Sequence, residues 1–483
     1  MKLLHTIALP VLLFITGANF PTKVIVSQKP IVKNIFQDGD STSAAEARKL
    51  IAEAKKTGSK SLAINNLFEP IPTELFQLSQ LETLDLTGYR LKTIPSDLGK
   101  LINLKSLNFS QTNLKTLPES FCDLKELTEL DFSFACSLPV FPASAGKLEK
   151  LVYLNLNFLA SGDCNGIAPD SLLSLPSSIG FLKSLKIITL SKSNIVTLPE
   201  SFGNLVNLEI LSAGKAFGLK KLPESFGRLK NLRDFNAALT DIEKLPASFG
   251  NLKNLRYLSL HATALKSLPE SFVNLNLDTL DLGSNNFTSL PANFGNIHAK
   301  YIALDNSPLT ALPASFGSIK NLEELDLSKT GITQLPESFV NLKNLKHLDL
   351  HNNKLKDLPA KFGNLKNLEW LDIQINAFRK LPESICDLSA LHYFSAGNNN
   401  INNLPACFAN LKKITDVNFY NNNFTVFPAV LEQLNNLENI SFAKCPITVL
   451  PSFISKFKTL KSLNLHGTKI PKLPKAYNVM DEN

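Results

Sequence analysis

Cysteine and histidine are sparse in this chain of 483 residues, which has 7 histidines. It contains 6 cysteines, and no two of them form a Cys-x-x-Cys pair, which argues against a structural zinc site. No glycine-rich phosphate loop is present, and nothing resembles a nucleophile held beside a base and an oxyanion donor. Beyond the N-terminal residues, no apolar run is long enough for a transmembrane helix. We therefore expect no catalytic residue, cofactor, metal ion or membrane span.

A proline, in contrast, recurs every 23 residues over most of the chain. Such a period is typical of stacked units that each bury their apolar face against their neighbours. In the stretch LPESFVNLKNLKHLDL, Leu348 and Leu350 flank Asp349, which is the alternation of a strand with one buried face. Pro359 then excludes a regular helix just upstream of it. Each unit is therefore predicted to be a short strand, a turn, a return arm and a second turn.

The predicted strands form one parallel sheet, because each is followed by another that runs in the same direction. The return arm is wider than the strand, so the stack must curve with its strands inside. A weaker strand near Leu62 and Ile64 precedes 17 clear ones, which are centred on Leu84, Leu107, Leu130, Leu154, Ile188, Leu211, Phe235, Leu258, Leu280, Ile302, Leu325, Leu348, Leu371, Phe394, Val417, Ile440 and Leu463.

From about Leu62 to Pro474 these units resemble the leucine-rich repeat family, pattern L-x-x-L-x-L-x-x-N-x-L, in its 23-residue class. The Leu-Pro-x-x-Phe arm is similar to that of Ras-suppressor and Ras-binding scaffold proteins and of plant leucine-rich repeat proteins. The resemblance implies an α/β solenoid, a horseshoe of about 17–18 repeats with a parallel concave sheet and irregular or 3-10 return arms. The family asparagine is present at Asn285, Asn353, Asn376, Asn399 and Asn422, and threonine replaces it at Thr112, Thr240, Thr263, Thr330 and Thr468. We expect this replacement to weaken local hydrogen bonding without threatening the fold.

The N-terminal residues 1–18 are predicted to be a secretory signal peptide. One lysine precedes the apolar run LLHTIALPVLLFIT, and Thr16 and Ala18 are the small residues required before a cleavage point. This places the protein outside the cell or at its surface. The alternative is a run that is not exported, which leaves the protein in the cytoplasm.

Residues 19–60 are expected to form an N-terminal segment with a capping helix at 43–57. Ser43 and Glu46 form a capping-box signature, and Gly58 closes the helix. Four apolar residues follow at helical spacing and should cover the first repeat: Ala47, Leu50, Ile51 and Ala54.

The solenoid is expected over 61–475, followed by a C-terminal tail at 476–483. Its rhythm breaks once, where an insertion within 157–174 loops out at one edge. Cys136 and Cys164 lie in the strand-to-arm turns of adjacent repeats, so a disulfide between them is a candidate. Free thiols are the expectation for the other cysteines, and Cys445 should be buried and inert.

The net charge of +8 has a regular source, a lysine seven residues after the proline in many repeats. This position lies on the outer arm. A basic ridge there could touch nucleic acid or anionic lipid, but a solvated outer face is the better interpretation, so no nucleic-acid partner is expected. The lysines are Lys125, Lys183, Lys230, Lys253, Lys320, Lys343, Lys366 and Lys412.

Strand residues between the core leucines point to the concave face. One column there contains the single tryptophan of the chain and four of its seven tyrosines. Rigid amphipathic aromatics beside polar groups are typical of binding hot spots, although strand faces also favour aromatics for packing. We predict a concave binding patch formed by Tyr301, Glu324, Asp326, His347, Asp349, His351, Trp370, Asp372, Tyr393, Asn418 and Tyr420.

The patch also contains residue types that can bind a divalent cation. His347, Asp349 and His351 alternate along one strand, between Asp326 and Asp372 on the neighbouring strands. The two histidines are separated by about 13 Å along the strand, so they cannot hold one ion. A site would need a histidine and carboxylates from adjacent strands, and aspartate is ordinary at this repeat position. The sequence therefore assigns no metal site.

The resulting hypothesis is a secreted or cell-surface protein without catalytic activity that binds a protein partner through its concave face. The protein partner is implied by the family resemblance, and a glycan or adhesion role is a further alternative. A third hypothesis is an intracellular signalling scaffold of the Ras-binding type, which requires that the N-terminal run is not exported.

Overall fold

The computed structural model describes residues 42–66, 70–88, 91–135, 141–157 and 174–471, all within one unit, Ser41–Val479. The predicted signal peptide and C-terminal tail lie outside the described residues. So do Cys136, Cys164 and nearly all of the insertion.

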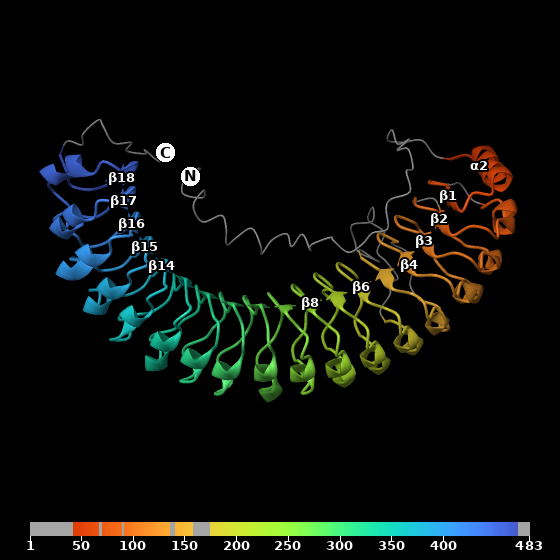
Figure 1. Cartoon of the computed structure of the whole chain (residues 1–483), viewed down its shortest axis with the longest axis horizontal. Coiled ribbons are helices and arrows are strands. Elements are labelled where there is room, and N and C mark those ends of the chain that lie inside the picture. Colours follow the sequence, from red (N-terminus) through yellow and green to blue (C-terminus); the bar gives the residue numbers. More distant parts are fainter. Residues whose placement is uncertain (1–41, 67–69, 89–90, 136–140, 158–173, 472–483) are drawn as a thin grey trace. The chain divides into compact units, whose positions relative to one another are not determined.

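Eighteen three-residue strands in the described part of the chain form one open sheet (Figure 1). Each strand pairs in parallel with the next along the chain, and the register aligns equivalent repeat positions, so that His347 faces Trp370 and Trp370 faces Tyr393. The expected solenoid with a parallel inner sheet is confirmed. The strands are β1 Ser61–Ala63, β2 Thr83–Asp85, β3 Ser106–Asn108, β4 Glu129–Asp131, β5 Tyr153–Asn155, β6 Ile187–Thr189, β7 Ile210–Ser212, β8 Asp234–Asn236, β9 Tyr257–Ser259, β10 Thr279–Asp281, β11 Tyr301–Ala303, β12 Glu324–Asp326, β13 His347–Asp349, β14 Trp370–Asp372, β15 Tyr393–Ser395, β16 Asp416–Asn418, β17 Asn439–Ser441 and β18 Ser462–Asn464.

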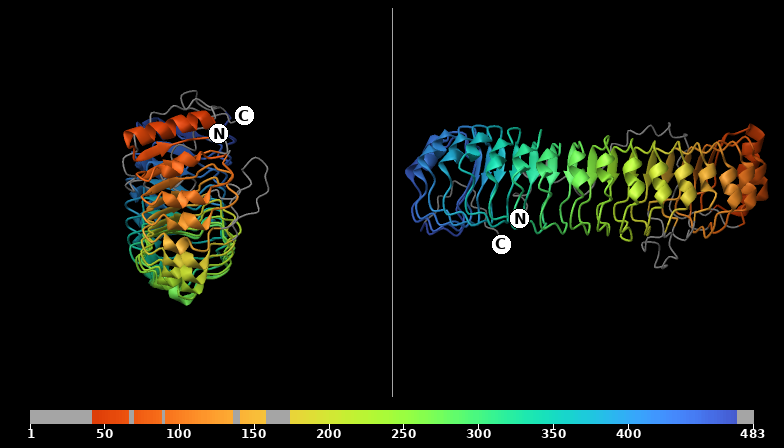
Figure 2. Two further views of the ribbon diagram at one scale, coloured as in Figure 1. Left: turned by 90° about the vertical axis from the view of Figure 1, so that its right-hand side faces the viewer. Right: turned by 90° about the horizontal axis from the view of Figure 1, so that it is seen from below.

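The return arms contain short 3-10 helices on the outer side of the arc (Figures 1 and 2). Pro336 shows why they begin where they do, since its φ of −65° and ψ of 150° hold the chain extended before the turn. The helices are η1 Thr73–Gln77, η2 Ser96–Lys100, η3 Glu119–Asp123, η4 Ala145–Lys147, η5 Ser177–Phe181, η6 Glu200–Asn204, η7 Glu224–Arg228, η8 Phe249–Asn251, η9 Glu270–Asn274, η10 Phe294–Asn296, η11 Phe316–Ser318, η12 Glu337–Asn341, η13 Phe362–Asn364, η14 Glu383–Asp387, η15 Ala406–Asn410, η16 Ala429–Gln433 and η17 Ser452–Lys456.

Between sheet and arms lies a continuous core of leucine, isoleucine and phenylalanine. The arm phenylalanines stack from repeat to repeat, with ring centroids 5.9 Å apart for Phe294 and Phe316 and 6.2 Å apart for Phe316 and Phe339. All three side chains are fully buried. Each repeat therefore completes its core only with its two neighbours, which is why the stack is stable as an array.

The family asparagine forms a ladder behind the sheet. Asn399 Nδ2 donates to the carbonyls of Ile373, Ala396 and Gly397 at 3.0, 3.0 and 3.2 Å, and its Oδ1 accepts from Phe378 N at 3.0 Å. Where threonine takes this position, fewer bonds form.

Thr240 illustrates the difference, because its Oγ1 donates only to Ala237 O at 2.8 Å. The expected weakening of local hydrogen bonding at the threonine repeats is therefore visible, and the strand pairing continues through them. Cys445, also at the ladder position, is buried as expected, with its Sγ 3.2 Å from Phe419 O.

Neighbouring arms approach closely at two repeat positions. A Cβ on Gly250 would stand 1.8 Å from Ser271 O, and the Gly250 N–H instead donates to Ser271 Oγ at 3.2 Å. At this approach a side chain on residue 250 would collide with the neighbouring arm, so glycine is required there. The same two arm positions, four and two residues after the proline, are occupied by Cys386 and Cys407 at η14 and η15.

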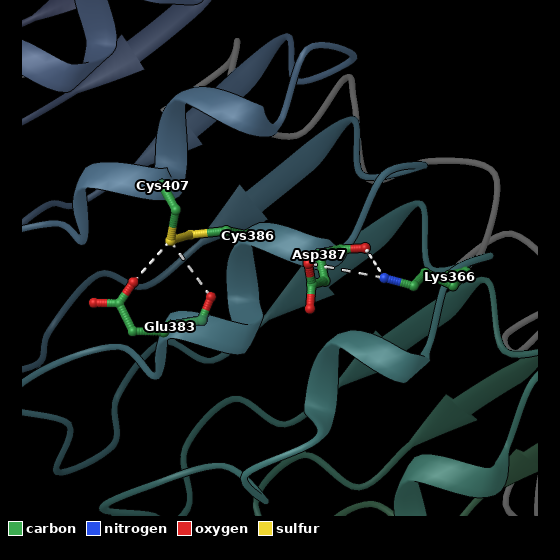
Figure 3. The surroundings of a disulfide bond; sticks show 5 residues. All are labelled: Lys366, Glu383, Cys386, Asp387 and Cys407. Atoms are coloured by element: carbon green, nitrogen blue, oxygen red, sulfur yellow. Dashed lines mark hydrogen bonds and ion pairs between the residues drawn. A yellow bond between two sulfur atoms is a disulfide. The ribbon is translucent and has the colours of Figure 1, made fainter.

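Cys386 and Cys407 form a disulfide with a Cα–Cα distance of 5.6 Å (Figure 3). The expectation of free thiols was wrong for this pair. The two cysteines differ in repeat position, so they look unrelated in the sequence, but stacking of the arms brings positions 21 residues apart together. Cys122 occupies the glycine-equivalent position of its own arm and remains a buried free thiol.

The helix α2 spans Ala44–Thr57 at the N-terminal end of the sheet. Ser43 Oγ accepts from Glu46 N at 3.2 Å, and Gly58 closes the helix with a φ of 64°. Its buried side chains are Ala47, Ile51 and Ala54, whereas Leu50 is 40% exposed and lies off the packed face. Among the described residues, none of the helices has both the length and the apolarity needed to cross a bilayer.

Candidate functional site

The predicted binding residues occupy three columns on the inner face between β11 and β16, here called the concave patch. Core side chains such as Leu348 and Leu371 point outward beneath them, so the intervening residues must face inward. All are half-buried except Asp372, which is buried. The first strand position holds Tyr301, Glu324, His347, Trp370 and Tyr393; the third holds Asp326, Asp349, Asp372 and Asn418; and His351 and Tyr420 lie two residues further on.

A stacked pair of aromatic rings, Trp370 and Tyr393, here called the aromatic plate, lies at the centre of the concave patch. The rings of Trp370 and Tyr393 stack at 5.2 Å between centroids with an interplanar angle of 7°. Their strands are hydrogen-bonded neighbours, and the parallel register holds the two rings side by side. The pair is therefore prearranged, and a ligand that contacts it orders no further aromatic side chain.

A row of carboxylates runs beside the plate. Asp326, Asp349 and Asp372 face one another in register, and each accepts a hydrogen bond from the backbone N–H two residues further on, at 2.8, 2.9 and 2.8 Å. Burial, and then the neighbouring Asp349 charge, raise the pKa of Asp326 to about 6 and that of Asp372 to about 7. This row is thus crowded with negative charge that neighbouring groups only partly offset.

The two histidines of the patch have different neighbours. His351 Nδ1 lies 2.8 Å from Asp349 Oδ1, whereas His347 starts β13 and joins no such cluster. Burial alone would lower the pKa of His351, but the hydrogen bond to Asp349 and the nearby carboxylates outweigh it and raise that pKa. Ligand atoms of Asp349, His351 and Asp372 all lie within 4.8 Å of one another.

A second cluster of this kind escaped the sequence analysis. His261, Asp281 and Asp305 from three neighbouring strands also converge within 4.8 Å, and His261 Nδ1 lies 3.3 Å from Asp281 Oδ1. Gly283 stands between them, and a Cβ there would lie 2.1 Å from Asp305 Oδ1 and 3.0 Å from His261 Nδ1. A glycine in an inner column, flanked by histidine and aspartate one repeat away on each side, is the signal that could have revealed it.

The outer lysines have a local structural role. Lys253, Lys343, Lys366 and Lys412 each donate to a backbone carbonyl at the end of the next 3-10 arm, at 3.3, 3.3, 2.9 and 3.1 Å. Figure 3 shows this contact for Lys366 and Asp387, beside the disulfide. Cations are favourable at helix C-terminal carbonyls, so this column needs no nucleic acid to account for it.

Three family models match parts of the chain. Models described as "Leucine-rich repeat region", "Leucine rich repeat" and "Leucine Rich Repeat" match residues 295–376, 79–136 and 276–297. The chain is a leucine-rich repeat protein. A comparison with curated proteins gives no significant match.

Solved structures with a similar fold include leucine-rich repeat proteins. A leucine-rich repeat protein of Leptospira interrogans shares 26% identity, covers 85% of this chain and 85% of its own, and gives a TM-score of 0.50. The Arabidopsis receptor kinase HAESA, solved with a peptide hormone and a co-receptor, shares 26% identity over 85% of this chain and 70% of its own, with a TM-score of 0.58. YopM of Yersinia enterocolitica, at 22% identity over 92% and 95% of the two chains and a TM-score of 0.53, supports the fold alone. The leucine-rich repeat fold and these neighbours support a binding role.

Proposed function

We propose that this leucine-rich repeat protein binds a protein partner through the concave patch, without catalysing a reaction. The observation that carries the proposal is the stacked pair of Trp370 and Tyr393, half-buried at the centre of the inner face. Aromatic side chains with rigid surroundings contribute most of the energy at many interfaces. The HAESA structure, in complex with a peptide hormone, supports a protein or peptide as the ligand class.

The proposed location is outside the cell or at its surface. The Cys386–Cys407 disulfide supports it, because such bonds persist in oxidising compartments and are rare in the cytosol. An intracellular scaffold of the Ras-binding type is the competing hypothesis, and the arm sequence favours it. N-terminal sequencing of the mature chain tests the first hypothesis, since a start just after Ala18 requires an exported and cleaved chain, whereas a start at Met1 shows that residues 1–18 are retained, as the scaffold or an uncleaved anchor would have them.

The concave patch is tested by capture and by direct binding. The mature chain and a Trp370→Ala/Tyr393→Ala variant are used to capture proteins, and each captured candidate is then measured as a purified pair by calorimetry. We expect the affinity of a true partner to fall at least about 30-fold, because truncating hot-spot residues costs about 2 kcal/mol or more.

Tyr153→Ala is the matched control. Tyr153 starts β5 in the same column, outside the concave patch, so its loss should leave affinity unchanged. Urea unfolding checks that all variants keep the fold. A partner that binds the double variant and the wild type equally well would show that the patch is not the interface.

A further inference from the structure

We propose that Asp349, His351 and Asp372 form a binding site for a divalent transition-metal ion of the zinc type on the inner face of the solenoid. This departs from the expectation drawn from the sequence. It does not depend on the proposed protein partner.

The donor atoms come from two neighbouring strands. Asp349 ends β13, Asp372 ends β14, and His351 lies two residues after Asp349. One oxygen of each carboxylate and one imidazole nitrogen all lie within 4.8 Å of one another. Zinc bonds of about 2.0–2.2 Å place ligands about 3.4 Å apart, so small side-chain rotations suffice to close around an ion.

The parallel register builds this arrangement. It sets the two aspartates directly opposite each other, and Asx-type hydrogen bonds to His351 N and Gln374 N fix the direction of both carboxylates. His351 Nδ1 already lies 2.8 Å from Asp349 Oδ1. A cation would enter between these two atoms and be bound by both.

An unsatisfied hydroxyl adjoins the cluster and provides independent support. Ser395 occupies the position of β15 that faces Asp372 and is fully buried. Its Oγ forms no hydrogen bond of good geometry with any described residue, although the Tyr393 phenol on the same strand is close enough to interact with it. The Gln374 side-chain amide links the strands on either side of Ser395. Its Nε2 donates to Asp372 Oδ2 at 2.7 Å, and its Oε1 accepts from Asn418 Nδ2 at 3.4 Å. A buried hydroxyl without a partner is costly unless a further group, such as a water on a bound ion, completes its bonding.

Charge points in the same direction. No lysine or arginine in the described ranges forms an ion pair with Asp326, Asp349 or Asp372, so His351 is the one basic side chain that pairs with this row. When all three aspartates are ionised, a single imidazole leaves part of their negative charge uncompensated. A divalent cation would compensate it at the position where the donor atoms converge.

The donor set selects the kind of ion. Calcium and magnesium take oxygen ligands, whereas one imidazole nitrogen with two carboxylates suits zinc and similar transition metals. Three protein ligands leave a coordination position open to water or to a ligand group.

Zinc chloride is the probe, titrated by calorimetry into the full mature chain. We expect binding by the wild type, and a loss of at least about 10-fold in affinity for this site in His351→Gln and in Asp372→Asn, since removing even a supporting group costs this much. The zinc stoichiometry at a fixed low concentration should fall by one. Zinc should also raise the midpoint of thermal unfolding of the wild type more than that of either variant.

The matched control is Asp131→Asn. Asp131 ends β4 and accepts from Ser133 N at 2.7 Å, as Asp372 does from Gln374 N, but no histidine follows it. Zinc binding should be unchanged in this variant. The proposal is overturned if His351→Gln and Asp372→Asn both bind zinc as the wild type does, which would indicate ligands elsewhere, such as thiols. It is also overturned if the wild type binds no zinc. Calcium binding in place of zinc would overturn the donor assignment. Urea unfolding checks that the variants fold. If only one of them folds, the zinc affinity of that variant alone decides the result.

Discussion

Replacing Asn399 with alanine tests how the asparagine ladder supports the stack. Asn399 is 6% exposed and makes four hydrogen bonds, three as donor and one as acceptor. The groups it leaves behind are not equally affected. Asn376 Nδ2 also donates to Ile373 O, and Asn422 Nδ2 also donates to Ala396 O.

The carbonyl of Gly397 likewise keeps a second donor, Ile375 N at 2.9 Å. The group without a substitute is Phe378 N–H, which is bonded to Asn399 Oδ1. Leaving one buried donor unsatisfied costs about 1–3 kcal/mol, and each lost hydrogen bond contributes about 1 kcal/mol more. With one unsatisfied donor and three lost bonds to carbonyls, we therefore expect Asn399→Ala to lower the free energy of unfolding by about 4–6 kcal/mol.

Thr240→Ala is the matched control at the same repeat position. It removes a single hydrogen bond and one buried methyl group, so we expect a loss of about 1–2 kcal/mol. Urea unfolding followed by circular dichroism gives both values. Because long repeat arrays can unfold in parts, hydrogen exchange should be measured as well.

Hydrogen exchange reports the mechanism at single residues. In Asn399→Ala the Phe378 amide should exchange faster, while the Ile401 amide, bonded to Asn422 Oδ1 at 2.9 Å, should stay protected. The reasoning would be refuted if Asn399→Ala cost no more than Thr240→Ala, or if Phe378 kept its protection.

Three further outcomes can be measured. Ser144→Cys should form a disulfide with Cys122 on oxidative refolding, because these residues occupy the same arm positions as Cys407 and Cys386 and their side chains already interact. Closing a loop of this size should add about 3 kcal/mol to the free energy of unfolding. Free thiols detected by mass spectrometry after refolding would contradict this prediction. Ile375→Asn should stabilise the protein by about 1 kcal/mol, because Ile375 is 46% exposed and has a φ of 52°, a conformation that asparagine tolerates better and that Asn352, Asn398 and Asn421 adopt at equivalent turn positions. A lower urea midpoint of the variant would contradict this. Burial raises the pKa of Asp234, so the native state holds this proton more tightly than the unfolded chain does and loses stability as pH rises from the ordinary aspartate pKa of 3.8 through the raised one. Asp234→Asn should therefore stabilise the protein at neutral pH and have no effect well below pH 3.8, and a gain that is constant with pH would refute it.

Much of the architecture could be predicted from periodicity. A proline every 23 residues and the Leu348–Leu350 alternation require a strand and a non-helical arm in each unit, and near-identical units can only stack in parallel register. The inward columns follow directly, because side chains alternate along a strand. The strands, the parallel sheet and the 3-10 arms were therefore predictable, and so was the position of each patch residue along its strand.

What the periodicity could not supply is the distance between side chains that differ in repeat position. Cys386 and Cys407 meet because adjacent arms approach closely at these two repeat positions. Asp349, His351 and Asp372 converge because the register places the two aspartates opposite each other and the His351 ring turns back onto Asp349 Oδ1. Both depend on turn geometry and on side-chain torsions, which are set by packing between repeats and have no counterpart in the spacing of residues along the chain.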